Sequence, residues 1–336
     1  MNAPVNPAVL IEKITFAQAI NMALDEAMAA DPEVLLFGED VADREGGGVF
    51  NASKGLSTKY GAARVRSTPI SEQAIIGAAV GAALAGMRPV AEIMLMNFTT
   101  VAMDQIVNHA AKIRFMSGGQ TAVPLTIRTA TGAGTGNGGQ HSDMLEAWFA
   151  HTAGLKVVTA SNPADAKALL MACIEDDDPC LFIENIPSYR AQGPAPEPGY
   201  RAKLGEAKIA RAGDDVTVIT YGRPMNEVSA VAEKLAGEGI SVEVIDLRTI
   251  APFDETTVLN SVGRTKRAVV VHEAVKNFGV GAEVSSRIHE ELFGDLKSAV
   301  RRVGSRFAPV PFSPALEKAF IYQADEIEAA IRATLD

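Results

Sequence analysis

One stretch shows most clearly how this 336-residue chain folds: Ser71-Glu-Gln-Ala-Ile-Ile-Gly-Ala-Ala-Val-Gly-Ala-Ala-Leu-Ala-Gly-Met-Arg-Pro-Val-Ala-Glu-Ile-Met94. Its first part, up to about Gly86, predicts a helix, and the apolar run from Pro89 to Met94 predicts a strand directly after it. The helix consists almost wholly of Gly and Ala behind its first turn. Such a smooth surface allows another helix to approach closely, so we expect it to contact another subunit.

The alternation of helix and strand continues in both directions along the chain. Upstream, apolar residues at helical spacing predict a helix over 15–30, with Thr15 and Gln18 as a capping box, and a buried strand over 34–37. Downstream, the pattern predicts a helix from Thr99 to about Met116, a strand from Val123 to Arg128, a helix through Leu145, Trp148 and Phe149, a strand from Lys156 to Thr159, a helix capped by Asn162-Pro163 and a strand from Pro179 to Glu184. This order is typical of an α/β fold whose parallel sheet is covered by helices on both faces.

A proline-rich segment, 192–200, interrupts the alternation and predicts a domain boundary. We therefore expect a first domain over 1–191, this segment as a stiff linker, and a second, smaller α/β domain over 201–336. The second domain is predicted to contain strands over Val216–Tyr221, Ser241–Asp246 and Ala268–His272, helices over Pro224–Ala236 and Asp254–Ser261, and an amphipathic segment after Pro314.

The composition excludes several classes of protein. With 31 Lys and Arg against 41 Asp and Glu, the chain carries a formal charge of −10, which argues against binding to nucleic acid. The most apolar stretch, 74–87, is well short of the roughly 20 residues that a membrane-spanning helix needs. Two cysteines are too few for a disulfide framework, and residues 1–13 show no targeting signal, so we expect a cytoplasmic protein.

A loop rich in glycine, residues 132–139, leads directly to His141. The loop lacks the Gly-Lys-Ser/Thr ending of a phosphate-binding loop, and a flexible surface loop is an equally simple interpretation. His141 could be a structural histidine. However, glycines immediately before it would let the backbone approach a ligand and hold an imidazole at the mouth of a pocket, where it could transfer protons.

Glu72 is the second candidate for a catalytic residue. A carboxylate in the first turn of a helix often only compensates the helix dipole, with Ser71 as the N-cap. The apolar neighbours Ile70, Ile75 and Ile76 suggest burial instead. Burial would raise the pKa of this carboxyl group and the helix terminus would lower it, so the sequence leaves its protonation state open.

Taken together, these motifs resemble one known family. They recur in order from about Ile14 to Ile331 as Phe37-Gly-Glu-Asp-Val41, Thr68-Pro-Ile-Ser-Glu72, Arg88-Pro-Val-Ala-Glu92, Asp104-Gln-Ile106, Met116-Ser-Gly-Gly119, Gln140-His-Ser142, Gly154-Leu-Lys-Val-Val158 and Asp246-Leu-Arg-Thr249. The chain resembles the beta subunit of the thiamine-diphosphate-dependent decarboxylase component of 2-oxoacid dehydrogenase complexes, including the acetoin dehydrogenases. The resemblance implies a transketolase-type pyrimidine-binding domain followed by a smaller transketolase-like C-terminal domain.

The resemblance also implies a cofactor shared with another chain. In this family the diphosphate and Mg²⁺ are held by a Gly-Asp-Gly motif, which this sequence lacks. The chain is therefore expected to supply only the pyrimidine half of the site and to need an alpha subunit, as two alpha and two beta chains. A lipoyl acyltransferase core would be a further partner. It could meet the acidic segment around Asp325, Glu326 and Glu328, although a solvated helix face is the simpler explanation of these residues.

Residue by residue, the resemblance assigns Glu72 to the pyrimidine N1′ of thiamine diphosphate and His141 to proton movement during acyl transfer. Phe98, with Met94 and Leu95, would flank the pyrimidine ring, or Phe98 is simply a core residue. A structural potassium ion would be held by the segments that contain Leu125, Thr126, Cys173, Asp176 and Asp178.

The expected reaction is oxidative decarboxylation of a 2-oxoacid, with pyruvate as the first choice and the acyl group passed to a lipoyl carrier. Asp143-Met144 and Ala153 depart from the pattern of many relatives near the acyl pocket, which leaves the substrate open. Acetoin cleavage and a carboligase reaction are alternatives that share every residue named. A regulatory subunit without chemistry is a further alternative, but Glu72 and His141 are both present.

Overall fold

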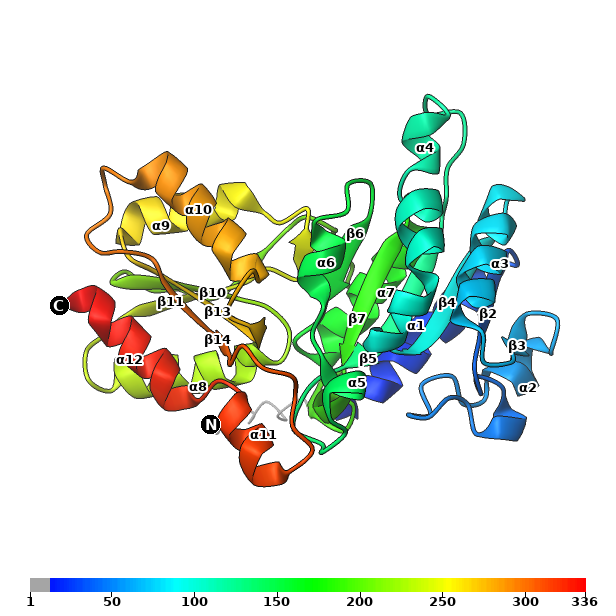
Figure 1. The fold of residues 1–336 in the computed structure, drawn as a ribbon, viewed down its shortest axis with the longest axis horizontal. Coiled ribbons are helices and arrows are strands. Elements are labelled where there is room, and N and C mark those ends of the chain that lie inside the picture. Colours follow the sequence, from blue (N-terminus) through cyan, green and yellow to red (C-terminus); the bar gives the residue numbers. More distant parts are fainter. Residues whose placement is uncertain (1–12) are drawn as a thin grey trace, which may run out of the picture.

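A computed structural model describes residues 13–336, and Figure 1 shows two sheets, each covered by helices. The first sheet has seven strands in the order β12-β6-β7-β5-β4-β2-β3. All neighbours are parallel except β12 with β6. The strands are β2 (Val34–Gly38), β3 (Val65–Ser67), β4 (Arg88–Leu95), β5 (Thr126–Thr131), β6 (Lys156–Thr159), β7 (Cys180–Asn185) and β12 (Thr249–Ala251).

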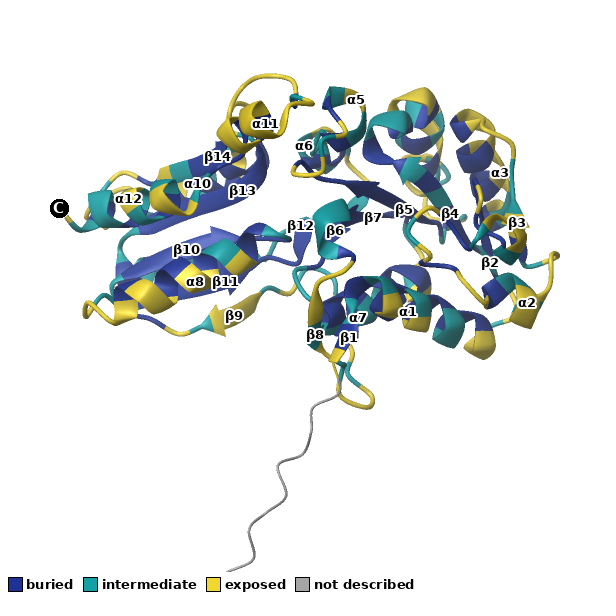
Figure 2. Cartoon of the chain, turned by 90° about the horizontal axis from the view of Figure 1, so that it is seen from below, coloured by how far each residue is buried: buried dark blue, intermediate teal, exposed yellow. Residues whose placement is uncertain are grey.

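Helices cover both faces of this sheet because alternate strand residues point to opposite sides. Val90 packs with α1 and α7, whereas the next residue, Ala91, packs with α3. Figure 2 shows α1 and α7 on one side of the sheet and α5 and α6 on the other. The helices are α1 (Phe16–Ala30), α2 (Leu56–Tyr60), α3 (Glu72–Leu84), α4 (Ile113–Met116), α5 (Gly139–Ser142), α6 (Glu146–Ala150) and α7 (Pro163–Glu175).

The second sheet has five strands in the order β14-β13-β10-β11-β9, with only β9 antiparallel to its neighbour. Helices α8 and α12 cover one face of this sheet. Helices α9 and α10 cover the other face, where they belong to the same hydrophobic core as residues of the first sheet. The elements are β9 (Lys208–Arg211), β10 (Val216–Thr220), α8 (Pro224–Ala236), β11 (Val242–Asp246), α9 (Glu255–Thr265), β13 (Ala268–Val275), α10 (Val280–Leu292), β14 (Arg301–Ser305), α11 (Pro314–Phe320) and α12 (Ala324–Leu335).

Most expected elements are present, and the α/β class is confirmed. Thr15 and Gln18 form the reciprocal capping box, and Asn162 caps α7 with Pro163 at its first position. Ser71 occupies the N-cap of α3, but its side chain makes no capping hydrogen bond. The proline-rich segment begins as a short strand, β8 (Gln192–Pro194), which pairs with β1 (Lys13–Thr15).

Two expectations were wrong. The long helix over 99–116 is instead a 3₁₀ segment, η2 (Met96–Ala102), a π-helical segment (Gln105–Ala110) and α4. The Thr99 and Thr100 hydroxyls donate to the carbonyls three residues earlier and so compete with regular helical bonding. The strand expected over 123–128 begins only at Thr126, because Pro124 has no N–H to give to a central strand.

Within residues 13–336, no helix combines the length and the apolar character that crossing a bilayer requires. Residues 1–12, where no targeting signal was expected, lie outside the described part of the chain.

Candidate active site

The candidate residues gather where the strands of the first sheet end. Parallel strands present their carboxyl ends at one edge, and ligands of α/β proteins bind there. Strand β2 leads to Glu39, β4 leads to Phe98, and β5 leads to the glycine-rich loop and His141. Strand β3 ends at Ser67, and the short loop after it leads to Glu72 at the start of α3. The topology therefore brings Glu72, Phe98 and His141 to the same edge.

Glu72 is a buried carboxylate, 8% exposed, and residues 13–336 offer it neither an ion pair nor a hydrogen bond to its side chain. It has acidic neighbours. Burial, together with the charges of Glu72, Asp40 and Glu92, raises the pKa of Glu39, which is itself 7% exposed. The side chain of Glu72 therefore lies at a buried, acidic position where its oxygens remain available to a hydrogen-bonding ligand.

Glu92 is held by a buried ionic network beneath this edge. Arg128 donates to Glu92 at 2.7 Å and to both oxygens of Glu184 at 2.7 and 2.9 Å, and Tyr189 also donates to Glu184. Burial by itself would lower the pKa of the Arg128 guanidinium. The charges of Glu184 and Glu92 outweigh burial and raise this pKa. The network ties β4, β5 and β7 together. Sequence reasoning missed it, although charged residues inside three apolar strands were a usable signal.

His141 lies against Phe98, with their rings edge to face and their centroids 5.4 Å apart. Asn97 locates the turn that carries His141, because its amide donates to the Gly139 carbonyl and to the Asp143 carboxylate, each at 2.9 Å. Nδ1 of His141 is buried and has no hydrogen-bond partner among the described residues. A buried polar atom without a partner is costly, and it indicates a position that a water or a ligand satisfies.

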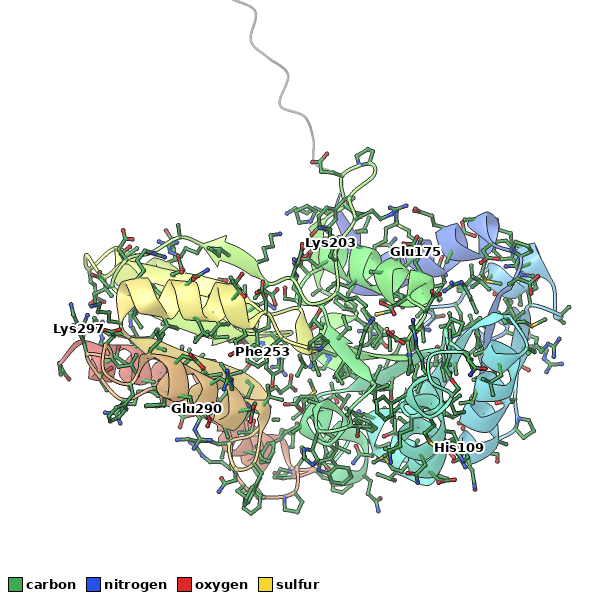
Figure 3. The ribbon with its side chains drawn as sticks, turned by 90° about the horizontal axis from the view of Figure 1, so that it is seen from above. His109, Glu175, Lys203, Phe253, Glu290 and Lys297 are labelled. Atoms are coloured by element: carbon green, nitrogen blue, oxygen red, sulfur yellow. The ribbon has the colours of Figure 1, made fainter. Side chains whose placement is uncertain are left out.

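Met94 and Leu95 end β4 directly before the segment that carries Phe98. Leu95 is buried, and Met94 and Phe98 are half-buried. These three residues therefore lie next to the site. Another histidine, His109, lies on the outside of the molecule, 3.4 Å from Asp104 and 53% exposed (Figure 3), so it does not join them.

The five residues expected near a potassium ion come together elsewhere, at the amino ends of β5 and β7 and the end of α7. The carboxylate of Asp176 binds Lys156 at 2.6 and 2.7 Å, and that of Asp178 binds Arg114 at 2.6 Å. The Leu125 carbonyl accepts a bond from Cys180, and the Cys173 carbonyl accepts one from Asp176. Thr126 begins β5 and is buried.

These carboxylates are therefore neutralised by side chains of the protein. No cluster of three or more His, Cys, Asp or Glu side chains suited to a metal exists within 13–336. A cavity of about 610 Å³, lined in part by Arg114, Lys156 and Pro252, adjoins this region. It lies at the opposite end of the strands from Glu72, so it is separate from the edge that carries Glu72, Phe98 and His141.

Comparisons with known proteins show which family the chain belongs to. The family described as "Transketolase, pyrimidine binding domain" matches residues 12–192, and "Transketolase, C-terminal domain" matches 205–327. The acetoin:2,6-dichlorophenolindophenol oxidoreductase subunit beta of Cupriavidus necator is 44% identical, over 97% of this chain and 98% of its own length. The pyruvate dehydrogenase E1 component subunit beta-2 of Oryza sativa is 42% identical, over 96% and 86%.

The 2-oxoisovalerate dehydrogenase subunit beta of Bacillus subtilis is 40% identical, over 95% of this chain and 98% of its own length. A solved structure described as a split gene transketolase, an inactive beta4 tetramer, shares the fold with a TM-score of 0.78 at 20% identity, over 96% of this chain and 98% of that one. The chain therefore belongs to the family of enzyme beta subunits formed by these dehydrogenases and oxidoreductases, which are built from a transketolase-type pyrimidine-binding domain and a transketolase C-terminal domain.

Proposed function

We propose that this chain is the beta subunit of a thiamine-diphosphate-dependent enzyme that oxidatively decarboxylates a 2-oxoacid, with pyruvate as the first substrate to test. The observation that carries the proposal is the buried Glu72, which no residue within 13–336 pairs with, at the same sheet edge as the Phe98 and His141 pair. Membership of the family agrees with it. The acyl group would pass to a lipoyl carrier.

The residues at this edge fit the pyrimidine half of thiamine diphosphate. Among the described residues, nothing bonds to the Glu72 carboxylate or to Nδ1 of His141, and Phe98 offers an aromatic wall. When bound, the cofactor supplies the carbanion and the electron sink that decarboxylation needs. Glu72 would hold a proton towards the pyrimidine ring, Phe98 with Met94 and Leu95 would orient that ring and exclude water, and His141 would move a proton at its imidazole beside the reacting carbon.

An alpha subunit completes the proposal. The sequence lacks the Gly-Asp-Gly motif, and residues 13–336 hold no carboxylate cluster suited to Mg²⁺. A formal charge of −10 is also unfavourable for holding a diphosphate without a metal. We assign the metal and the diphosphate to an alpha chain, in an assembly of two alpha and two beta chains in the cytoplasm.

A lipoyl acyltransferase core remains a proposed partner, but the acidic segment of α12 does not support docking there. Glu326 binds Arg306 and completes the capping box of α12, and Glu328 binds Lys234 and Arg332. These charges are satisfied within the chain, which favours the interpretation as a solvated helix face. A potassium ion also remains a proposal. Because Lys156 and Arg114 occupy the carboxylates, backbone carbonyl oxygens would have to supply its ligands.

The test is co-expression with the candidate alpha chain, followed by turnover with thiamine diphosphate, Mg²⁺ and an artificial electron acceptor. Pyruvate, branched 2-oxoacids and acetoin are compared, because 44% identity to an acetoin oxidoreductase subunit makes acetoin the specific second candidate. We expect activity only with both chains and the cofactor. Full activity of the isolated beta chain would refute the two-chain assignment. Turnover of acetoin without turnover of any 2-oxoacid would make acetoin the substrate in place of a 2-oxoacid.

A further inference from the structure

The glycine-rich loop 132–139 directs its backbone N–H groups at two buried carboxylates from the second half of the chain. Gly134 donates to Glu317 at 2.6 Å, and Gly136 donates to both oxygens of Glu317 at 3.0 and 3.3 Å. Ala133 donates to Glu273 at 3.1 Å. Glu317 and Glu273 are 4% and 5% exposed. The backbone N–H groups of this loop therefore bind carboxylates of the same chain, although the loop lacks the ending of a phosphate-binding loop.

Glycine is required for this geometry. Gly134 and Gly136 have φ values of 113° and 73°, in the region that side chains disfavour, and these conformations turn both N–H groups towards one carboxylate. Phe312, a few residues before Glu317, closes the loop from outside. A Cβ atom on Gly138 would lie only 2.4 Å from its ring. Figures 1 and 2 both show α11, which carries Glu317, beside α5.

The loop ends at the turn that carries His141. The N–H of His141 donates to the Gly138 carbonyl at 3.2 Å, and Asn97 holds the next carbonyl, that of Gly139. His141 is thus anchored from two sides: Asn97 belongs to the first half of the chain, and Glu317 to the second. Five of the eight loop residues are glycines, and the side chain of Asn137 bonds within the loop to Thr135 at 2.9 Å. Contacts from outside, those of Glu317 among them, therefore contribute to the conformation of the loop.

We propose that Glu317 is a positioning residue. Through Gly134 and Gly136 it holds the glycine-rich loop in the conformation that keeps His141 against Phe98, so that the second half of the chain takes part in the chemistry of the first. The inference rests on the proposed function, in which His141 acts on the substrate.

The first test compares variants in the complete alpha/beta enzyme. Glu317→Gln keeps the size of the side chain and one acceptor oxygen, but it loses the charge and the second acceptor. Because small misplacements of catalytic groups cost up to about 100-fold in rate, we expect kcat to fall by roughly 10- to 100-fold while KM for the substrate changes little. The NMR signals of the His141 ring should also shift, because the ring would move relative to Phe98. Glu317→Asp, which keeps the charge, should recover part of kcat.

The matched control is Glu233→Gln, an exposed glutamate that pairs with Arg211 far from the loop. It should behave as wild type. Wild-type kcat and unchanged NMR signals of the His141 ring in Glu317→Gln would overturn the proposal, as would an equal loss of kcat in the control variant.

The second test does not depend on activity. Hydrogen exchange of the amides of residues 133–136 is measured in the isolated chain, where loss of one hydrogen bond should accelerate exchange by about 10-fold in Glu317→Gln at unchanged global stability. If that variant does not fold, the exchange rates of the Gly134 and Gly136 amides in the wild type test the proposal instead. Fast exchange of these two amides would overturn it. An inactive wild-type complex with protected amides would refute the proposed function while leaving the loop anchored by Glu317.

Discussion

Glu146 should make the stability of this chain fall as the pH rises towards neutrality. Its carboxyl group is fully buried, with one oxygen accepting from Tyr221 at 2.8 Å and the other without a partner among the described residues. Burial raises the pKa of Glu146 from 4.5 to about 7. The folded state thus binds the proton more tightly than the unfolded chain does. The stabilisation is complete below pH 4.5 and is lost as the pH rises through 7, a change of about 3 kcal/mol.

The assay is urea unfolding at several pH values between 5 and 8, for the wild type and for Glu146→Gln. Gln keeps an acceptor for Tyr221 but does not titrate. Between pH 5 and 7 each buried carboxyl with a raised pKa contributes a slope of about 1.4 kcal/mol per pH unit. Burial also raises the pKa of Asp246 to about 7, so Asp246 contributes a second slope of the same sign.

Relative to the wild type, Glu146→Gln should therefore change the slope by about 1.4 kcal/mol per pH unit, and the double variant with Asp246→Asn should change it by about twice as much. If the free energy of unfolding of Glu146→Gln had the same pH dependence as that of the wild type, Glu146 would not hold a proton in the folded state. That result would refute the reasoning.

Three further predictions concern the site and its support. Glu72→Gln in the complete alpha/beta enzyme should lower kcat by roughly 10²–10⁴-fold, as expected for a positioned proton-holding group, with an unchanged circular dichroism spectrum; an unaffected rate would remove Glu72 from its role. His141→Ala should slow acyl transfer by a comparable factor while leaving cofactor binding intact, which calorimetric titration of thiamine diphosphate would check. Arg128→Met leaves Glu92 and Glu184 buried without their cation and should lower the free energy of unfolding by about 3–5 kcal/mol, whereas Arg211→Met, which breaks an exposed pair, should change it by less than about 1 kcal/mol.

Local signals predicted much of the fold correctly. Thr15 and Gln18 satisfy each other's backbone within one turn, so the start of α1 needs nothing from the rest of the chain. The apolar strand of Lys156–Thr159 and the helix of Pro224–Ala236 have the expected bounds for the same reason. The segment 96–116 failed because side-chain hydrogen bonds of Thr99 and Thr100 divided it, which periodicity does not register.

The sequence by itself determined the order of the helices and strands, the α/β fold class and the choice of Glu72 and His141 as candidate residues. These depend on local patterns and on motifs. Only the tertiary structure decided what surrounds them. Arg128 lies 36 residues from Glu92 and 56 from Glu184, and Gly134 lies 183 residues from Glu317. The sequence does not show which acceptor will satisfy a given backbone N–H group. Nor does it show which donor will satisfy a given carboxylate. Such partners are chosen when the two sheets pack together and every buried polar group must find one.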